Sequence, residues 1–175
     1  MNTDCWNIIL QFIKSNKNKC NLLMTHKDMI NCNVYFEEPN DLRNITKSTW
    51  FNNFINIIVN GKYDELPLST KYVTFGNRFK YSDKGIFPQS VTHVKLNKKY
   101  CESVKDLIPS SVTHLQIGNR INNGEIKNIP ISIKELICDG FIYDEKRGVI
   151  YDHLYDTTKI IFNEDPADFP KYVKL

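Results

Sequence analysis

Four copies of one short pattern follow one another along the chain at a fixed step of 21 residues. Each copy opens on an apolar residue and a proline, and the prolines are Pro67, Pro88, Pro109 and Pro130. A constant period in this range is typical of solenoids, in which each unit buries its apolar edge against its neighbours. Chance similarity would not keep one register over four copies, so the repeat is the strongest signal in the chain.

Apolar side chains follow each proline at three, six and eight positions. This is the L-x-x-L-x-L spacing of a leucine-rich repeat, in which the alternating pair lies on a short strand and points inward. A serine two places after each proline can bond nearby backbone, so Pro-x-Ser predicts a turn. A further side chain at twelve positions is expected to return to the core. The predicted core columns are Thr70, Val73, Phe75 and Phe79; Val91, Val94, Leu96 and Tyr100; Val112, Leu115, Ile117 and Ile121; and Ile133, Leu136, Cys138 and Ile142.

The pattern apolar-Pro-x-Ser-Val-Thr-His-Leu-x-Ile-Gly, which stands in full at 108–118, resembles the FNIP repeat. This repeat is a leucine-rich-repeat relative found in amoebae and in the giant viruses that infect them. The resemblance covers about 75 residues and rests on the Pro-x-Ser and strand columns. The Phe-Asn pair of the family is reduced to Ile121-Asn122 in one copy and is absent elsewhere. The resemblance implies a solenoid with one parallel strand per repeat.

The first thirty residues carry short helical patterns. Trp6, Ile9, Leu10 and Ile13 form an i, i+3, i+4, i+7 stripe that predicts a helix over residues 4–14. The polar run 15–18 is expected to break it. A second short helix would carry Cys20, Leu22, Leu23 and Met24, and a third would carry Met29 and Ile30.

Residues 3–32 loosely resemble a degenerate F-box. The pattern is followed by Asp4-Cys5-Trp6-x-x-Ile9-Leu10-x-Phe12-Ile13 and by Leu22 to Met29, whereas Met1-Asn2 stand where Leu-Pro is usual and Lys19 replaces an apolar residue. The resemblance implies that a Skp-family adaptor docks on helix 1, through Ile9, Leu10, Phe12 and Ile13. The alternative is that the helices only cap the open end of the solenoid, because terminal repeats need a covered outer edge.

The segments that flank the clean repeats are less regular. Residues 34–36 suggest a strand, and Pro39 with Asn40-Asp41 predicts a turn. Phe54, Ile57 and Val59 reproduce the core spacing, so residues 54–59 are interpreted as the first solenoid strand, with Trp50 and Phe51 covering the junction with the helices. Beyond the fourth copy the spacing returns at Thr157, Ile160 and Phe162, and the stretch 169–175 echoes it again. About seven parallel strands are expected.

The predicted fold class is therefore α+β, with N-terminal helices followed by a leucine-rich-repeat-like solenoid. Residues 1–50 are predicted to form the F-box-like or capping segment and residues 51–175 the solenoid. The clean repeats span about 66–86, 87–107, 108–128 and 129–149, with a degenerate cap at 150–175. The loops opposite the strands are expected to be irregular or single 3₁₀ turns, because too few periodic apolar residues follow each strand for a regular helix.

Composition excludes several classes of function. The net charge of the 175 residues is only +3 and is spread along the chain, so no nucleic-acid footprint is visible. No tract approaches the ~18 apolar residues of a membrane span. Five cysteines at irregular spacing give neither a disulfide framework nor a zinc pattern. We expect a reduced, intracellular and cytoplasmic protein, in the host cytoplasm if the chain is viral.

Side chains that flank the inward pair on each strand are expected to face the exposed side of the sheet. Neighbouring strands lie about 4.8 Å apart, so these side chains form ladders. A mixed ladder with aromatic members favours protein binding, and the alternative is a plain solvated sheet. The candidate target-binding residues are Tyr72, Thr74, His93, Lys95, His114, Gln116, Glu135 and Ile137.

The sequence contains little evidence for a metal site or a catalytic site. His93 and His114 share a column and could hold a metal ion, but no carboxylate or thiolate joins that column before Glu135. No G-x-S-x-G motif and no phosphate-binding glycine loop occurs. We therefore expect a non-enzyme without cofactor or metal, and an enzyme that uses the histidine ladder is a distant alternative.

The FNIP and F-box resemblances together imply a substrate-receptor subunit of a cullin-type ubiquitin ligase. Its partners would be a Skp-family adaptor and an unknown target protein, with no nucleic acid or membrane partner. The second hypothesis is a non-enzymatic interaction or scaffold protein whose helices only cap the array.

Overall fold

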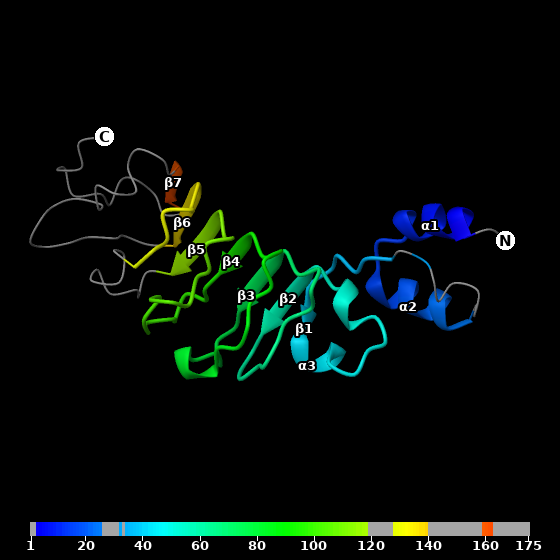
Figure 1. The fold of residues 1–175 in the computed structure, drawn as a ribbon, viewed down its shortest axis with the longest axis horizontal. Helices are drawn as coiled ribbons and strands as arrows, with labels where there is room; N and C mark the ends of the chain where they lie inside the picture. Colours follow the sequence, from blue (N-terminus) through cyan, green and yellow to red (C-terminus); the bar gives the residue numbers. More distant parts are fainter. Residues whose placement is uncertain (1–2, 26–31, 33, 119–127, 140–158, 163–175) are drawn as a thin grey trace, which may run out of the picture.

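The computed structural model describes residues 3–25, 32, 34–118, 128–139 and 159–162. Two helices, α1 (Thr3–Phe12) and α2 (Asn16–Thr25), stand at one end of an elongated molecule, and a parallel sheet extends away from them (Figure 1). The sheet has seven strands in sequence order. Their bounds are β1 Asn40–Asp41, β2 Asn56–Val59, β3 Tyr72–Phe75, β4 His93–Lys95, β5 His114–Gly118, β6 Glu135–Asp139 and β7 Lys159–Phe162. The chain thus has the predicted α+β class and leucine-rich-repeat-like solenoid fold.

The strand register follows the 21-residue period of the sequence. Val73 is paired with Val94, Val94 with Leu115, and Leu115 with Leu136. The next step is longer, because Leu136 pairs with Ile160, 24 residues on. Each strand pairs with the strands that precede and follow it in the sequence, so every repeat contacts its neighbours, as in a solenoid. The parallel stacking predicted from the repeat is confirmed.

The core columns predicted from the repeat lie inside the solenoid. Every member that the structure describes at positions three, six, eight and twelve is at most 4% exposed. In β2 the same holds for Phe54, Ile57 and Val59, at 3%, 0% and 1%. Burial of this kind contributes about 1.5–3 kcal/mol for each large apolar side chain. Ile121 and Ile142 lie outside the described residues, as do the side chains of Cys138, Ile160 and Phe162.

The prolines mark the turns that enter the strands. In all four repeats the proline carbonyl accepts a hydrogen bond from the N–H three residues later, at 3.0 to 3.2 Å. The Ser90 hydroxyl lies 2.7 Å from the carbonyl oxygens of both Leu68 and Thr70, and so links its turn to the preceding repeat. The hydroxyls of Ser111 and Ser132 are buried with no partner among the described residues. The Pro-x-Ser turn is confirmed, but its serine is used differently from repeat to repeat.

The side of the solenoid opposite the strands is built from loops and short 3₁₀ turns. One such turn, η3 (Tyr81–Asp83), follows β3, which agrees with the predicted single 3₁₀ turns. Aromatic rings fill the interior behind it, with the centroids of Phe75 and Phe79 4.0 Å apart and those of Phe79 and Tyr100 6.2 Å apart. A second turn, η2 (Phe51–Asn53), lies just before β2.

The N-terminal helices are joined to the start of the solenoid. Helix α1 agrees with the predicted stripe, whereas α2 begins at Asn16, inside the run that was expected to break the pattern. The reason is a contact from distant sequence: the Asn16 backbone N–H donates to the Glu38 carboxylate at 2.7 Å. A carboxylate at this position stabilises a helix N-terminus. The predicted third helix and the predicted strand at 169–175 lie outside the described residues.

The segment before β2 differs from the prediction. Asn40–Asp41 was expected to be a turn and instead forms β1, which pairs with Ile57 and Ile58 of β2. A strand of two residues is too short to show an alternation of apolar and polar residues in the sequence. Its extended conformation follows from the parallel pairing with β2. Helix α3 (Leu42–Ile45) follows, with the Asp41 carboxylate accepting from the Arg43 N–H as its N-cap. Strand β2 is therefore the second strand of the sheet and not the first.

Candidate functional site

The outer face of the sheet brings the predicted target-binding residues together. A hollow of about 230 Å³ lies on this face. Seven of the eight predicted residues line it, Glu135 being the exception, and Asn56 of β2 adds a side chain that the prediction did not include. The strand alternation places these side chains opposite the buried columns. Tyr72 is 42% exposed and Lys95 is exposed, whereas Thr74, His93, His114, Gln116, Glu135 and Ile137 are half-buried.

Three rings form a continuous stack across β3, β4 and β5. The centroids of Tyr72 and His93 are 4.5 Å apart with the planes at 39°, and those of His93 and His114 are 4.2 Å apart at only 10°. The register places each ring directly beside the next. Glu135 continues the column on β6. The 21-residue step has therefore assembled a column of packed rings from residues that are far apart in sequence.

The threonine before each histidine fixes the orientation of its ring. The Thr92 hydroxyl lies 2.8 Å from His93 Nδ1, and the Thr113 hydroxyl lies 2.9 Å from His114 Nδ1. The Thr92 carbonyl in turn accepts from the backbone N–H groups of Thr113 and His114. The Thr-His pair of the repeat thus has a local structural role. The threonine hydroxyl holds Nδ1 of the following imidazole and leaves Nε2 without a contact to that hydroxyl.

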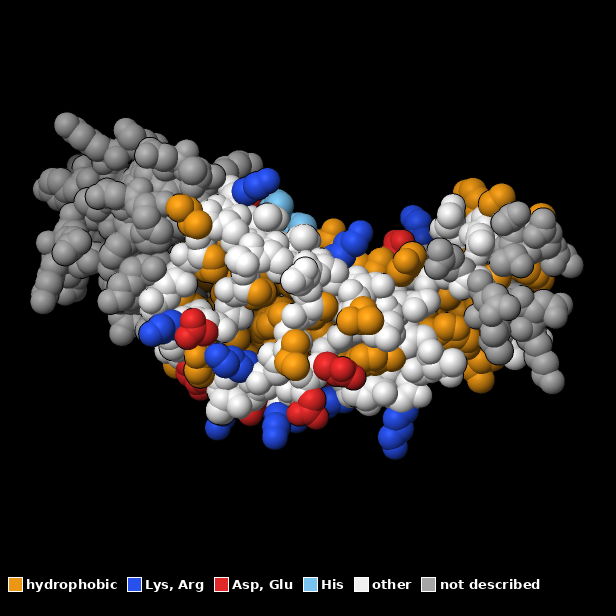
Figure 2. Space-filling view, viewed as in Figure 1, with side chains coloured by type: hydrophobic (Ala, Val, Ile, Leu, Met, Phe, Trp, Pro, Cys, Tyr) orange, Lys and Arg blue, Asp and Glu red, His pale blue; other side chains and the backbone are white. Residues whose placement is uncertain are grey.

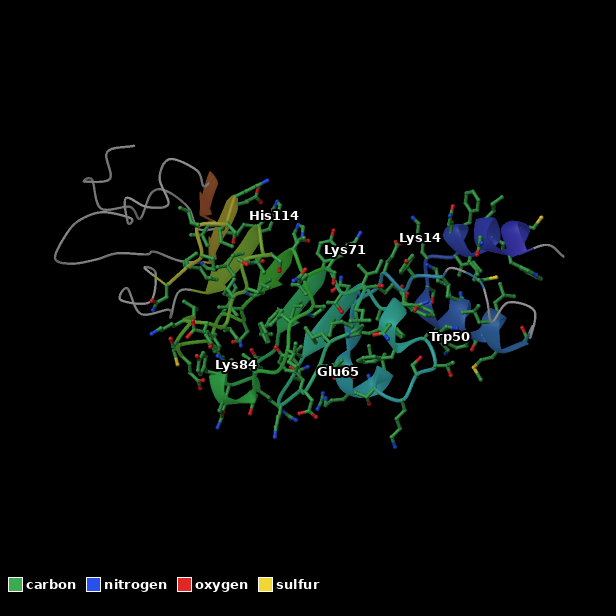
Figure 3. The ribbon with its side chains drawn as sticks, in the orientation of Figure 1. Lys14, Trp50, Glu65, Lys71, Lys84 and His114 are labelled. Carbon is green, nitrogen blue, oxygen red and sulfur yellow. The ribbon has the colours of Figure 1, made fainter. Side chains whose placement is uncertain are left out.

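The electrostatics of the face favour the neutral form of His93. Burial lowers the pKa of His93 below its usual value, the neighbouring His114 lowers it further, and Glu135 raises it. Lys71, just before β3, and Lys95 are exposed. Figure 3 places Lys71 and His114 along the same side of the sheet, and Figure 2 shows the pale blue imidazoles between basic side chains.

Metal chemistry finds no donor set in the part of the chain that the structure describes. No group of three or more His, Cys, Asp or Glu side chains gathers there closely enough to hold an ion. The stacked rings of His93 and His114 cover each other's faces and leave their hydrogen-bonding edges toward the outer side of the sheet. This arrangement can contact another surface through the exposed edges of the rings.

The predicted adaptor-binding residues do not share one environment. Leu10 is 2% exposed and belongs to the core, so its side chain is not presented on the outer surface of α1 to a docking protein. Phe12 is 81% exposed, and Ile9 and Ile13 are half-buried. Ile8 is also exposed. Any docking surface on α1 is therefore narrower than the sequence stripe and is centred on Phe12.

The helices contain one functional candidate that the sequence prediction missed. Lys19 is only 4% exposed and lines a pocket beside α1. The available signal was the helical spacing of Asn16, Lys19 and Leu23, which form the buried face of α2. Two polar members on a buried face indicate polar contacts there.

No helix in the described ranges is long and apolar enough to cross a membrane. No protein-family model matches the chain, and no curated protein matches it. Among solved structures, the chain is similar to one described as CroV588, a novel circular LRR protein structure, with 16% sequence identity and a TM-score of 0.45. The similarity covers 73% of this chain and 22% of that chain, so this chain spans about a fifth of the length of the solved one.

Proposed function

We propose that the chain is a protein-interaction module that binds its target on the outer face of the sheet. A leucine-rich-repeat-like solenoid suggests this class of function, because it offers an extended regular surface. The observation that carries the proposal is the stack of Tyr72, His93 and His114 beside a 230 Å³ hollow. Large rings held rigidly by their neighbours lose little side-chain entropy on binding, which favours them as anchor residues.

The more specific proposal is that the chain is a substrate-receptor subunit of a cullin-type ubiquitin ligase. It rests on the FNIP resemblance of the repeats and the F-box resemblance of residues 3–32. Residues 1–50 would then bind a Skp-family adaptor, and residues 51–175 would bind the target. The adaptor would contact Phe12, together with Ile9 and Ile13, because Leu10 is committed to the core.

A second candidate is a scaffold whose helices only cap the array. The contacts of α2 favour it. The Asn16 side chain donates to the Glu38 carbonyl at 3.0 Å, the Lys19 ammonium donates to the Tyr35 carbonyl at 2.7 Å, and Leu23 is buried. Such contacts cover the open end of the solenoid, which any repeat array needs.

The two candidates are separated by affinity purification of tagged variants from cells that express the full chain. Phe12→Asp, at an exposed position, would remove a ligase adaptor and keep the target, whereas a capping role predicts an unchanged set of partners. Replacing both His93 and His114 by Ala would remove the target and keep the adaptor. Lys62→Ala, an exposed position away from both surfaces, is the matched control.

Circular dichroism of each purified variant establishes that it is folded. Retention of the same target by the folded double histidine variant would refute binding on the sheet face. If no variant, the original chain included, captures an adaptor in an assay able to detect micromolar affinity, the ligase proposal fails and the scaffold remains.

A further inference from the structure

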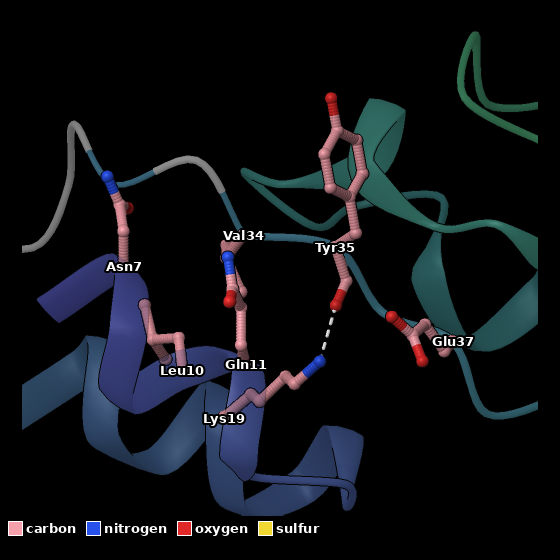
Figure 4. Close-up of a pocket in the computed structure, with 7 residues that line it drawn as sticks. All are labelled: Asn7, Leu10, Gln11, Lys19, Val34, Tyr35 and Glu37. Atoms are coloured by element: carbon pink, nitrogen blue, oxygen red, sulfur yellow. Dashed lines mark hydrogen bonds between the residues drawn. The ribbon is translucent and has the colours of Figure 1, made fainter. Parts of the chain in front are cut away.

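A pocket of about 500 Å³ lies between α1 and the segment that leads into the sheet, away from the sheet face (Figure 4). Pockets of this volume are in the range that holds small ligands. It is lined by Asn7, Leu10, Gln11, Lys19, Val34, Tyr35 and Glu37. The lining combines two aliphatic side chains with an ammonium, two amides and a carboxylate.

The Lys19 ammonium is the central group of this pocket. The residue is 4% exposed, although lysine is almost never buried without a partner. Among the residues that the structure describes, the Tyr35 carbonyl, at 2.7 Å, is the one acceptor of its three N–H donors. The ion pair found in the described ranges joins Arg43 to Asp41 and does not involve Lys19. Within the described residues, two donors of a buried cation are therefore left for a ligand.

The remaining lining indicates the chemical class of that ligand. A buried ammonium is stabilised most by an anionic oxygen, and a carboxylate supplies two. The Gln11 amide, on an exposed residue of α1, offers a further donor at the rim. Leu10 and Val34 are the aliphatic members of the lining. The ligand therefore needs an anionic head and an apolar body.

We propose that this pocket binds a carboxylate carried on an apolar body, with the carboxylate against the Lys19 ammonium and the body against Leu10 and Val34. Two sources share this chemistry: a small free carboxylic acid, and the C-terminal residue of a peptide. The binding site is distinct from the sheet face and is not required by the function proposed above.

Glu37 gives the proposal a sharp test. Its carboxylate lies at the rim on the side of Tyr35 and Lys19, as Figure 4 shows, and Glu37 is exposed. A negative charge there repels an incoming carboxylate, although solvent screens the repulsion. Removal of this charge should strengthen binding of an acid and leave binding of a neutral ligand unchanged. A purely structural lysine would produce neither effect.

The experiment is a titration of the full 175-residue chain followed by backbone amide NMR. The probes are 4-methylpentanoate, N-acetyl-leucine and, as the neutral match of the latter, N-acetyl-leucinamide. We expect both acids to shift the amide signals of Leu10, Lys19 and Tyr35, and the amide probe to bind about tenfold more weakly or not at all, because it lacks the charge that meets the ammonium. Tighter binding of N-acetyl-leucine than of 4-methylpentanoate would assign a peptide C-terminus, and the reverse a small free acid.

Three variants complete the test. Glu37→Gln should tighten both acids about two- to fivefold, and Gln11→Glu should weaken them by a similar factor. Lys19→Met should abolish the preference for acid over amide. If Lys19→Met does not fold, the two exposed variants still decide the matter. Equal binding of acid and amide by the original chain, or an affinity for the acids that neither exposed variant changes, would overturn the proposal.

Discussion

The imidazole rings of His93 and His114 lie nearly parallel, 4.2 Å between centroids, on two strands that pair directly. One repeat separates them in sequence, so the same 21-residue step that stacks the core also stacks the exposed face. The inner and outer ladders are therefore two products of one register. Substitutions in the exposed column, such as His93 and His114, should leave the fold intact. Substitutions in the buried column, such as Leu115, should lower the stability of the fold.

The pKa of His93 provides the first prediction. Burial and the nearby His114 lower it, and Glu135 raises it. We expect NMR titration to give His93 a pKa below about 6.5, the usual value for histidine. His114→Gln should raise this pKa while leaving it below the usual value, because burial is the larger cause. Glu135→Gln should lower it further.

The same shift predicts how stability depends on pH. Because the folded pKa of His93 is lower than the unfolded one, the unfolded state binds more protons between the two values. The contribution of His93 is thus fully present above about pH 6.5 and is lost as pH falls through the folded pKa. Urea unfolding at several pH values should show this loss, and His93→Gln should remove the pH dependence that His93 causes.

The pKa measurement also tests the stack of the two rings. A decrease of the His93 pKa in the His114→Gln variant would contradict the stacked arrangement.

Leu115 tests the inner ladder. It is 1% exposed between Val94 and Leu136 on the adjoining strands. Leu115→Ala should lower the free energy of unfolding by about 2–5 kcal/mol, because it leaves a cavity that both neighbours line. Lys95→Ala, on the outer face of β4, is the control and should change it by less than about 0.5 kcal/mol. Urea denaturation followed by circular dichroism measures both, and equal effects would show that the columns are wrongly assigned.

Gly118 tests the close approach of two repeats at the end of β5. A Cβ atom at this position would lie 2.6 Å from Lys98 Cα and 2.9 Å from its carbonyl oxygen. These are backbone atoms, so Gly118→Ala requires the two repeats to move apart and should cost about 1–3 kcal/mol. At Gly76 the obstructing atoms belong to the Asn60 side chain, which can move at the cost of its hydrogen bond to Asp41. Gly76→Ala should therefore be the milder of the two in thermal unfolding.

Asp41 predicts the behaviour of the chain in acid. Arg43 donates to both carboxylate oxygens, at 2.9 and 2.7 Å, and Asn60 donates at 2.9 Å. The Arg43 side chain is the main cause that holds the pKa of Asp41 well below its usual range. Carbon-detected NMR titration should find this low pKa, and Arg43→Ala should raise it.

Because the pKa of Asp41 is lowered in the folded state, its contribution to stability decreases as the pH falls. It is present above the unfolded pKa, about 3.9, and is lost as pH falls through the lower folded value. Asp41→Ala, which removes the α3 N-cap, should cost about 0.5–2 kcal/mol at pH 7. The difference between the two chains should narrow below about pH 4. A constant difference down to pH 2 would exclude the ionised carboxylate as the stabilising group.

The solenoid could be predicted because its signal is repeated. The positions of Val94, Leu115 and Leu136 follow from spacing alone, since a parallel strand that slips by one residue would expose its whole buried set. The outer face follows from the same register by alternation. What the spacing does not contain is the hydrogen bond from threonine to histidine, which depends on side-chain geometry within each strand.

The N-terminal third was harder to predict because contacts distant in sequence determine it. β1 is formed by pairing with β2, and α2 begins where Glu38 can reach Asn16. Lysine side chains usually lie at the surface, whereas Lys19 is buried. The residue type alone would therefore not predict that Lys19 lines a pocket. The stripe through Leu10 predicts a helix, but its spacing does not show that Leu10 packs into the core while Phe12 stays exposed.

The sheet pairs each strand only with its chain neighbours, in the order in which they are synthesised. Duplication of one 21-residue segment within the gene would therefore insert a new strand and interrupt only one existing strand pairing. Evolution can therefore lengthen or shorten the outer face of the sheet in whole repeats, and substitutions can then change its exposed residues one strand at a time.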